Sequence, residues 1–390
     1  MRIPFTPAAL TAGTAAVAGT KPLVNGTNPA EVLMTNNGHI YVSLYDGASF
    51  STMMNRTVPG NPTWTKFVEP NKLYAVNENG ADMTLFHLDL QGSHVSLTPV
   101  TSTAGSEGVV HVELSQDGTR MVGAGYGAGA VDIWDTSNEG LKLIKTIESN
   151  GELGPVKPNQ DQAHPHQAVL DPSGRFFAVN DLGTDEILLL DSQDDAFDVV
   201  RKVPVTAGCG PRHGVFYPQG AETPTHYMVS CELSNMVIIY ELQYAKADIE
   251  FTKVNAISTF APNATVPEGA AAGEIALSHD NRHFYVSNRL TGATSDTIAH
   301  FTIGYAGTQS INYVSETPTG GVSPRMFSLT TDGTEILVGN QKGPEGVVAL
   351  GLNSDGSIMS KPKASLPVSM FGDNESGPPF IQQIKSLGKM

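Results

Sequence analysis

Arginines, a histidine and a glutamate recur at matching places of a repeated sequence pattern. Arg212, Arg289 and Arg325 stand at three such places in a chain with only 23 lysines and arginines. His166 and Glu232 stand at two others. Arginines bind carboxylates and developing oxyanions, and a histidine or glutamate beside them can move a proton. The residue types therefore predict anion binding coupled to acid–base chemistry, if the fold brings them together.

The elements that must position these residues are the strands of the repeat. Each copy is an apolar strand, a turn and a second apolar strand ending in a polar residue, as in Ala168–Asp181. Seven copies align, with turn positions at 38, 72, 118, 174, 220, 281 and 333. A third strand follows most copies, for example 131–137 and 237–243. Three strands per unit and a variable fourth predict an all-β, seven-bladed β-propeller, with four-stranded antiparallel blades around a central channel.

Other folds explain the pattern less well. A β-sandwich does not need a period of about 50 residues, and no stretch of helical crossover length separates the strands, which excludes a parallel α/β fold. Residues 21–390 are therefore predicted to form a single propeller domain. The first residues of this domain and the segment from Lys361 onwards are predicted to close the ring.

The repeat also predicts which residues meet. In each blade the first two strands form a hairpin, so the start of strand one and the end of strand two lie at the same end. Eight residues before each turn position stand Ala30, Trp64, Val110, His166, Arg212, Gly273 and Arg325. The second strands end at Tyr45, Glu78, Tyr126, Asp181, Glu232, Arg289 and Gln341. Both sets are predicted to ring one mouth of the channel. A structural alternative stays open, in which charges of neighbouring blades simply neutralise one another.

The segments resemble the lactonase-type seven-bladed propellers, which include bacterial 6-phosphogluconolactonases and fungal 3-carboxy-cis,cis-muconate cyclases. The resemblance is firmest from about 160 to 350. It rests on His166-Gln-Ala-Val-Leu-Asp-Pro, Gly210-Pro-Arg-His-Gly-Val-Phe-Tyr-Pro, Cys231-Glu-Leu-Ser-Asn and Val286-Ser-Asn-Arg289. It implies four catalytic residues, His166, Arg212, Glu232 and Arg289. The Ser323-Pro-Arg325 segment also matches, whereas the N-terminal third matches only in pattern.

The remaining polar and aromatic residues of the predicted mouth are expected to bind substrate. They are Arg325, Asp181, Glu78, Trp64, Tyr126 and Gln341. The leading prediction is a secreted aldonolactonase that hydrolyses sugar lactones such as glucono-1,5-lactone. One alternative is a carboxymuconate-type cyclase, because it also needs arginines beside a proton-transfer group. A further alternative is a non-catalytic propeller that binds a ligand or a protein.

Composition and motifs limit the kinds of ligand and partner that we expect for this protein. The net charge of −16 and the pI of about 5.0 argue against nucleic acid, whose backbone needs dense Lys and Arg. The sequence contains no run of about 18 apolar residues, so it predicts no membrane span. The sequence carries no HExxH or CxxC metal motif and no GxSxG nucleophile elbow. We therefore expect a monomer that takes a small lactone or carboxylate without metal or cofactor.

Two further features concern the cellular location. Residues 1–20 are predicted to be either a signal peptide or a disordered arm. Four glycosylation sequons, at Asn25, Asn55, Asn263 and Asn374, favour secretion over the cytoplasm. Cys209 and Cys231 flank one predicted hairpin and form either one disulfide or two buried thiols.

Overall fold

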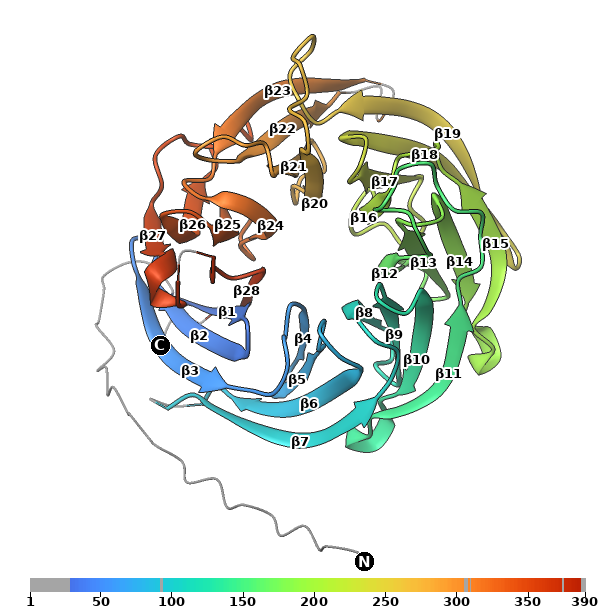
Figure 1. Cartoon of the computed structure of the whole chain (residues 1–390), viewed down its shortest axis with the longest axis horizontal. Coiled ribbons are helices and arrows are strands. Elements are labelled where there is room, and N and C mark those ends of the chain that lie inside the picture. The colour runs from blue at the N-terminus through green and yellow to red at the C-terminus, as the bar shows by residue number, and fades with distance from the viewer. Residues whose placement is uncertain (1–28, 92–93, 305–307, 309, 374, 387–390) are drawn as a thin grey trace, which may run out of the picture.

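Seven four-stranded antiparallel sheets stand like blades around a common axis in the computed structural model (Figure 1). The structure describes residues 29–91, 94–304, 308, 310–373 and 375–386. The predicted seven-bladed all-β fold is confirmed. The segment 1–20 and two of the sequons, Asn25 and Asn374, lie outside the described residues.

Blade 1 is built from both ends of the described chain, whereas blades 2 and 3 each consist of four consecutive strands. Blade 1 contains β28 (Phe380–Ser386), β1 (Ala30–Asn36), β2 (His39–Tyr45) and β3 (Phe50–Thr57). Blade 2 contains β4 (Thr65–Val68), β5 (Lys72–Ala75), β6 (Asp82–Asp89) and β7 (Ser96–Ala104). Blade 3 contains β8 (Val109–Leu114), β9 (Arg120–Gly125), β10 (Ala130–Asp135) and β11 (Lys142–Glu148).

Blades 4 to 7 each follow the chain from the innermost strand outwards. Blade 4 contains β12 (Pro165–Leu170), β13 (Phe176–Asp181), β14 (Glu186–Asp191) and β15 (Asp198–Pro204). Blade 5 contains β16 (Pro211–Tyr217), β17 (His226–Cys231), β18 (Met236–Ala245) and β19 (Asp248–Ser258). Blade 6 contains β20 (Ala271–Leu277), β21 (His283–Arg289), β22 (Thr297–Ile303) and β23 (Ile311–Pro318). Blade 7 contains β24 (Val322–Leu329), β25 (Glu335–Lys342), β26 (Glu345–Gly351) and β27 (Ala364–Pro367).

Short 3-10 turns connect some of the strands. No described helix is long and apolar enough to cross a membrane. The turns are η1 (Ser137–Glu139), η2 (Gln193–Asp195) and η4 (Val368–Met370). Between the first two strands of a blade, glycine in the left-handed region makes the hairpin turn, as at Gly118 (φ 69°) and Gly174 (φ 80°). Side chains at these positions would strain the turn, so the Asp-Gly and Ser-Gly signals locate the hairpins correctly.

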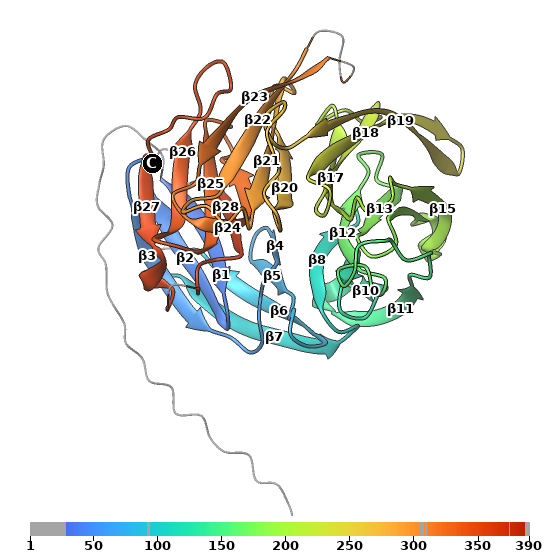
Figure 2. The same cartoon turned by 45° about the horizontal axis from the view of Figure 1, so that its top comes forward.

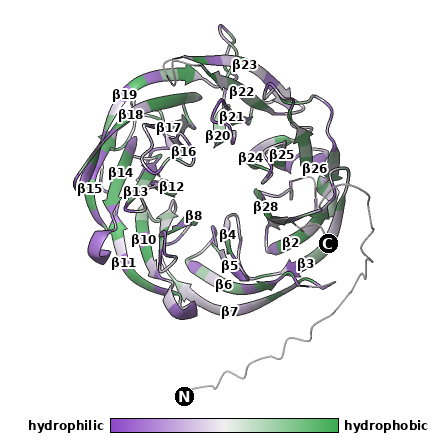
Figure 3. Cartoon of the chain, turned by 180° about the vertical axis from the view of Figure 1, so that it is seen from behind, coloured by the Kyte–Doolittle hydropathy of each residue, from purple (hydrophilic) through white to green (hydrophobic). Residues whose placement is uncertain are grey.

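Burial changes from the middle of a blade to its rim. Every residue of β13 is buried, because both faces of this strand pack against neighbouring blades. The outermost strand β11 alternates between exposed and partly buried residues instead. Between blades 4 and 5, the core includes Phe176, Ile187 and Tyr227. Burying each such side chain contributes about 1.5–3 kcal/mol. Figure 3 shows the resulting pattern, with hydrophobic residues along the strands and hydrophilic residues in many loops.

The last strand closes the ring, as predicted for the segment from Lys361 onwards. Strand β28 pairs with β1 and becomes the innermost strand of blade 1, so both ends of the described chain share one sheet. In the tilted view of Figure 2, β28 lies beside β1 and β24. The ring is thus held shut by backbone hydrogen bonds.

The closing strand overturns one part of the sequence prediction. Because β28 is innermost, β1 and β2 are the second and third strands of blade 1, not the first and second. Ala30 and Tyr45 therefore lie at the opposite end of the ring from the predicted mouth. Tyr45 donates a hydrogen bond to Glu335, at the start of β25. Phe380 begins the innermost strand where Ala30 was expected.

Candidate active site

A bulge interrupts the innermost strand of blades 3 to 7 at the predicted ring position. The interruptions lie between Val109 and His111, Pro165 and Gln167, Pro211 and Gly214, Ala272 and Ile275, and Pro324 and Met326. A bulge leaves residues out of the strand ladder and redirects their side chains. The residues left out include His166, Arg212 and Arg325. We call this end of the ring, where the innermost strands begin, the site face.

One carboxylate holds two arginines together at the site face. Glu232 Oε2 lies 2.8 Å from Arg212 Nε and 2.8 Å from Arg289 Nη2. Arg212 and Glu232 start and end the first hairpin of blade 5, while Arg289 ends the hairpin of blade 6. Their side chains are only 2%, 19% and 9% exposed for Arg212, Glu232 and Arg289. The predicted convergence of these three residues is confirmed.

The charges of this cluster depend on one another. Burial opposes the ionisation of Glu232, but Arg289 and Arg212 hold the pKa of its carboxyl below the ordinary value. Burial, followed by repulsion from Arg289, lowers the pKa of Arg212 to about 9, against the attraction of Glu232. Glu232 is therefore ionised at neutral pH and occupied by two cations. Such a carboxylate positions arginines better than it accepts protons.

Arg212 and Arg289 also have side-chain N–H groups that could donate hydrogen bonds to a ligand. Among the described residues, Arg212 Nε and Nη1 and Arg289 Nε are buried without a hydrogen-bond partner. The contact of Arg212 Nε with Glu232 is close enough for an ion pair but lacks hydrogen-bond geometry. Buried N–H groups without partners are costly, so they favour an anionic or carbonyl oxygen as ligand.

Arg325 is committed to a different carboxylate. Its Nη2 lies 2.9 Å from Glu78 Oε2 and its Nη1 donates to Glu78 Oε1 at 3.2 Å. The pair joins blade 7 to blade 2 past the inner end of blade 1. Burial acts to raise the pKa of Glu78, but the charge of Arg325, together with hydrogen bonds from Thr63 and Arg325, leaves that pKa below its ordinary value. This pair matches the structural alternative of charges that neutralise one another.

Aromatic rings form the rest of the site face. The ring of Tyr126 lies edge-on to that of His166, with centroids 5.6 Å apart. Trp64 lies 4.2 Å from His111 and 5.1 Å from Phe380 by the same measure. Burial, then the positive charge of Arg212, holds the pKa of His166 well below its ordinary value. His166 is thus a neutral imidazole.

Two predicted substrate ligands have other surroundings. Asp181 is fully buried, and its carboxylate accepts hydrogen bonds from the backbone N–H of His164 at 2.8 Å and of Gly183 at 2.9 Å. Ser149 Oγ donates to its other oxygen. This geometry does not fit the predicted role of Asp181 in substrate binding, because both carboxylate oxygens are engaged inside the protein. Gln341 is partly buried and accepts a hydrogen bond from Ser323 Oγ at 3.1 Å.

Three polar residues of the site face escaped the sequence analysis. His111, His213 and Glu274 follow the ring positions Val110, Arg212 and Gly273 directly. In blades 5 and 6 the bulge leaves two residues out of the ladder, so the second one also leaves the sheet. Counting seven as well as eight residues back from each turn would have found all three.

Gly273 occupies a ring position where blades 4, 5 and 7 carry a cation or a histidine. A Cβ atom here would lie 2.4 Å from Ser287 Oγ and 3.0 Å from Arg289 Nε. Contacts below 3.0 Å force a shift. The missing side chain thus leaves room for Arg289 to reach the cluster from the second strand.

Gly273→Ala is expected to fold but to force Ser287 to shift and to move Arg289 by a few tenths of an ångström. Because a misplacement of about 1 Å can cost roughly 10²-fold in turnover, we expect a smaller but measurable loss here. Steady-state kinetics alongside far-UV circular dichroism would measure this effect. Unchanged turnover in a folded variant would contradict the placement of Arg289.

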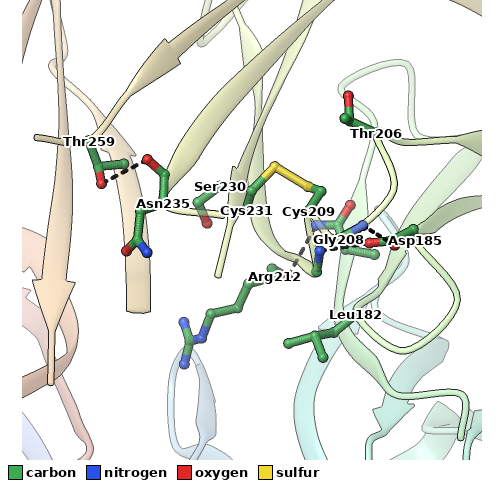
Figure 4. The surroundings of a disulfide bond; sticks show 12 residues. Leu182, Asp185, Thr206, Gly208, Cys209, Arg212, Ser230, Cys231, Asn235 and Thr259 are labelled. Atoms are coloured by element: carbon green, nitrogen blue, oxygen red, sulfur yellow. Dashed lines mark hydrogen bonds between the residues drawn. A yellow bond between two sulfur atoms is a disulfide. The ribbon is translucent and has the colours of Figure 1, made fainter. Parts of the chain in front are cut away.

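A disulfide clamps the loop and strand that carry Arg212 and Glu232. Cys209 and Cys231 are bonded, with Cα atoms 4.7 Å apart, and both are fully buried. Figure 4 shows Arg212 extending from the segment that follows Cys209. Glu232 comes directly after Cys231, and its backbone N–H donates to Gly210 at 2.8 Å. Of the two alternatives left open for the cysteines, the structure has the disulfide.

Replacing both cysteines by alanine is expected to lower stability and turnover together. A native crosslink typically contributes 2–4 kcal/mol, and its loss would loosen the Arg212–Glu232 contact. Urea unfolding and steady-state kinetics of Cys209→Ala/Cys231→Ala would measure both effects. A destabilised variant with wild-type turnover would show that the crosslink does not position the ion pair.

A surface hollow of about 680 Å³ lies at the opposite end of the ring. It is lined by the turns after β8 and β12 and includes Arg120 and Arg175. Both arginines are already paired, Arg120 with Asp195 and Arg175 with Asp191. Within the described ranges, no group of three or more His, Cys, Asp or Glu side chains could hold a metal ion. The site face remains the better candidate.

Comparison with known proteins gives a consistent result. The family described as "Lactonase, 7-bladed beta-propeller" matches residues 23–369. A curated protein of Arthroderma benhamiae, named "Probable 6-phosphogluconolactonase", is 30% identical over 292 residues, 70% of this chain and 72% of that protein.

Two solved structures share the fold. The periplasmic gluconolactonase PpgL of Pseudomonas aeruginosa has a TM-score of 0.77 at 21% identity and covers 92% of this chain and 99% of its own. A protein from Lactobacillus plantarum has a TM-score of 0.75 at 22% identity and covers 92% and 100%. At these identities the two structures support the fold alone.

Proposed function

Because the chain belongs to the family of seven-bladed lactonase propellers, we propose that it hydrolyses a sugar lactone at the site face. The observation that carries this proposal is the pair of buried arginines, Arg212 and Arg289, that share Glu232 and keep N–H groups without partners. Ester hydrolysis places negative charge on a carbonyl oxygen, and preorganised donors stabilise that charge. The curated relative of Arthroderma benhamiae is also named as a lactonase, a probable 6-phosphogluconolactonase.

In the proposed reaction, arginines bind the carbonyl oxygen and an imidazole transfers the proton. Arg212 and Arg289 donate hydrogen bonds to the lactone carbonyl oxygen. A neutral imidazole removes a proton from water while the water oxygen bonds to the carbonyl carbon. The tetrahedral oxyanion then collapses, the bond to the ring oxygen breaks, and the imidazolium returns the proton to that oxygen. His166, the imidazole predicted from the sequence, is a neutral ring in this site, because burial and the charge of Arg212 lower its pKa.

The charge balance of the site favours a substrate without phosphate. Three arginines, Arg212, Arg289 and Arg325, face three carboxylates, Glu78, Glu232 and Glu274, so no positive charge is in excess when all three carboxylates are ionised. A neutral lactone brings no charge of its own and develops one negative charge only in the transition state, where the unpartnered N–H groups of Arg212 and Arg289 can meet it. A phosphorylated lactone brings about two more negative charges at neutral pH, as phosphate esters do. We therefore propose an aldonolactone such as glucono-1,5-lactone.

We also propose that the protein is exported. A buried disulfide persists in oxidising compartments and is rare in the cytosol. Two sequon asparagines within the described residues, Asn55 and Asn263, are exposed and open to glycosylation. N-terminal sequencing of protein from the culture medium tests this. A start near Gly19 would support export, and an intact Met1 would contradict it.

The substrate proposal is tested by acid release from a panel of compounds. Glucono-1,5-lactone is expected to react faster than its 6-phosphate, after subtraction of uncatalysed hydrolysis. Cyclisation of 3-carboxymuconate would favour the cyclase alternative instead. Inactivity toward the whole panel would favour a non-catalytic propeller.

A further inference from the structure

A buried histidine and a buried glutamate face each other beside the arginine cluster. His213 Nδ1 lies 3.0 Å from both Oε1 and Oε2 of Glu274. Their side chains are only 2% and 8% exposed. His213 sits in the bulge of blade 5 and Glu274 in that of blade 6, so neither belongs to a strand ladder. A carboxyl group that engages one ring nitrogen fixes the orientation of an imidazole.

The ring of His213 lies among side chains of three other blades. Its centroid is 5.5 Å from Trp64 in blade 2, 5.7 Å from His111 in blade 3 and 5.1 Å from His166 in blade 4. A blade 5 side chain with these contacts must reach toward the common axis. With Nδ1 engaged by Glu274, only Nε2 remains to meet a substrate. Nδ1 of His111 and of His166, by contrast, has no hydrogen-bond partner among the described residues.

The two proton acceptors predicted from the sequence lack this support. Glu232 is ionised but held by Arg212 and Arg289. After burial, the charges of Arg212, His213, Arg325 and Arg289 lower the pKa of His166, and its Nδ1 has no hydrogen-bond partner among the described residues. An imidazole in that field hydrogen-bonds well in its neutral form but accepts a proton poorly.

Unlike His166, His213 has a carboxyl group beside its ring, that of Glu274. Burial raises the pKa of Glu274 to about 7, against the charges of Arg212 and Arg289 and a hydrogen bond from the backbone N–H of Ile275. Burial, Arg212, Arg325 and Arg289 lower the pKa of His213, and only Glu232 acts in the other direction. His111 and His166 complete the titratable groups in contact with its ring. Two groups this close titrate as one unit, and a unit that takes up a proton near neutrality suits general base catalysis.

We propose that His213 and Glu274 together form the proton acceptor of the lactone site, an inference that rests on the proposed function. His213 Nε2 removes the proton from the attacking water, and the carboxylate of Glu274 stabilises the imidazolium through Nδ1–H. The new bond joins the water oxygen to the carbonyl carbon, and the displaced π electrons move to the oxygen held by the arginines. When the ring C–O bond breaks, Nε2 returns the proton to the ring oxygen. His166 hydrogen-bonds the substrate as a neutral imidazole.

The test is the pH profile of Glu274→Gln with glucono-1,5-lactone. Gln keeps the size of the side chain and its oxygen near Nδ1 but cannot ionise. We expect kcat to fall roughly 10²-fold or more. In the wild type, kcat/KM should rise with pH through an acid limb near pH 7, because the deprotonated pair is the active form. In Glu274→Gln that limb should move to lower pH, since only the imidazole still titrates.

Companion variants separate this role from a structural one. His213→Asn should lose turnover as Glu274→Gln does. His166→Asn should also react more slowly but should keep its acid limb near pH 7. Melting curves of all three variants would show that they are folded.

Two results would overturn the inference, and they are distinguishable. An active wild type whose acid limb is unchanged in Glu274→Gln, but lost in His166→Asn, would make His166 the base and leave the proposed function intact. A wild type that hydrolyses no lactone would remove the proposed function and the proton-accepting pair with it.

Discussion

Glu232→Gln is expected to lower kcat/KM for a sugar lactone by 10²–10³-fold and to destabilise the fold. The substitution keeps the shape of the side chain but removes the carboxylate charge that both Arg212 and Arg289 contact. The two cations would then repel each other and leave their positions, so the oxyanion would lose its donors. Breaking a largely buried ion pair on one side costs about 3 kcal/mol.

The loss of stability should depend on pH with a definite sign. The pKa of Glu232 is lower in the folded chain than in the unfolded one. Its contribution is therefore present above the ordinary glutamate pKa and is lost as the pH falls through the lower folded value. The stability gap between wild type and Glu232→Gln should close in acid.

Urea unfolding at several pH values, together with steady-state kinetics, would measure these effects. Glu148→Gln is the matched control, because Glu148 is exposed at the end of the outermost strand β11 and should change neither quantity. Wild-type kinetics in Glu232→Gln would show that Glu232 does not organise the site. A gap that widens in acid would contradict its ionised state.

Arg212→Gln is expected to reduce kcat by 10²–10³-fold, the usual cost of removing one oxyanion donor. Arg212 is the most buried of the three arginines and keeps Nε and Nη1 without hydrogen-bond partners in the described part of the chain. Its pKa of about 9 adds a second signature. The charged form is the active one, so wild-type activity should decline as the pH rises through about 9. In Arg212→Gln that alkaline decline should disappear.

Arg201→Gln is the control for this variant. Arg201 on β15 forms an ion pair with Asp248 on β19, in the outermost strands of blades 4 and 5. Its loss should leave turnover and the alkaline limb unchanged. Equal effects of the two substitutions would mean that charge in general, not Arg212 in particular, supports activity.

Much of the site follows from the sequence, because the hairpin turns set the register. Counting back from the turn glycines Gly174, Gly220 and Gly333 placed a histidine and two arginines at one end of the ring, namely His166, Arg212 and Arg325, and their bulges confirm the alignment. The pairing of Arg212 and Arg289 with Glu232 agrees with this count. A backbone register is local information, and a tight turn fixes it.

Other parts depend on interactions that no single copy of the repeat contains. The innermost strand of blade 1 comes from residues 380–386, so the copy around position 38 was assigned one strand too far inwards. The carboxylate of Asp181 is engaged by backbone N–H groups of irregular segments, which strand patterns do not describe. His213 and Glu274 leave their strands only because two bulges are one residue longer than the others.

The structural alternative for the charges holds for one pair and fails for the other. Arg325 and Glu78 form an ion pair with one hydrogen bond across blades 7 and 2, and no nitrogen of Arg325 is buried without a partner in the described part of the chain. Arg212 and Arg289 share one carboxylate and retain N–H groups that it does not satisfy. The Arg325–Glu78 pair therefore links two blades, whereas Arg212 and Arg289 can still bind an oxyanion.

The central claim is that Arg212 and Arg289 bind the oxyanion of a sugar lactone. Its most direct test is acid release from glucono-1,5-lactone by the wild type, Arg289→Gln and Arg201→Gln, measured side by side and corrected for spontaneous hydrolysis. The wild type and Arg201→Gln are expected to turn over at equal rates, with Arg289→Gln slower by roughly 10²-fold or more. Equal rates for all three proteins, or no rate above the spontaneous one for any of them, would contradict the claim.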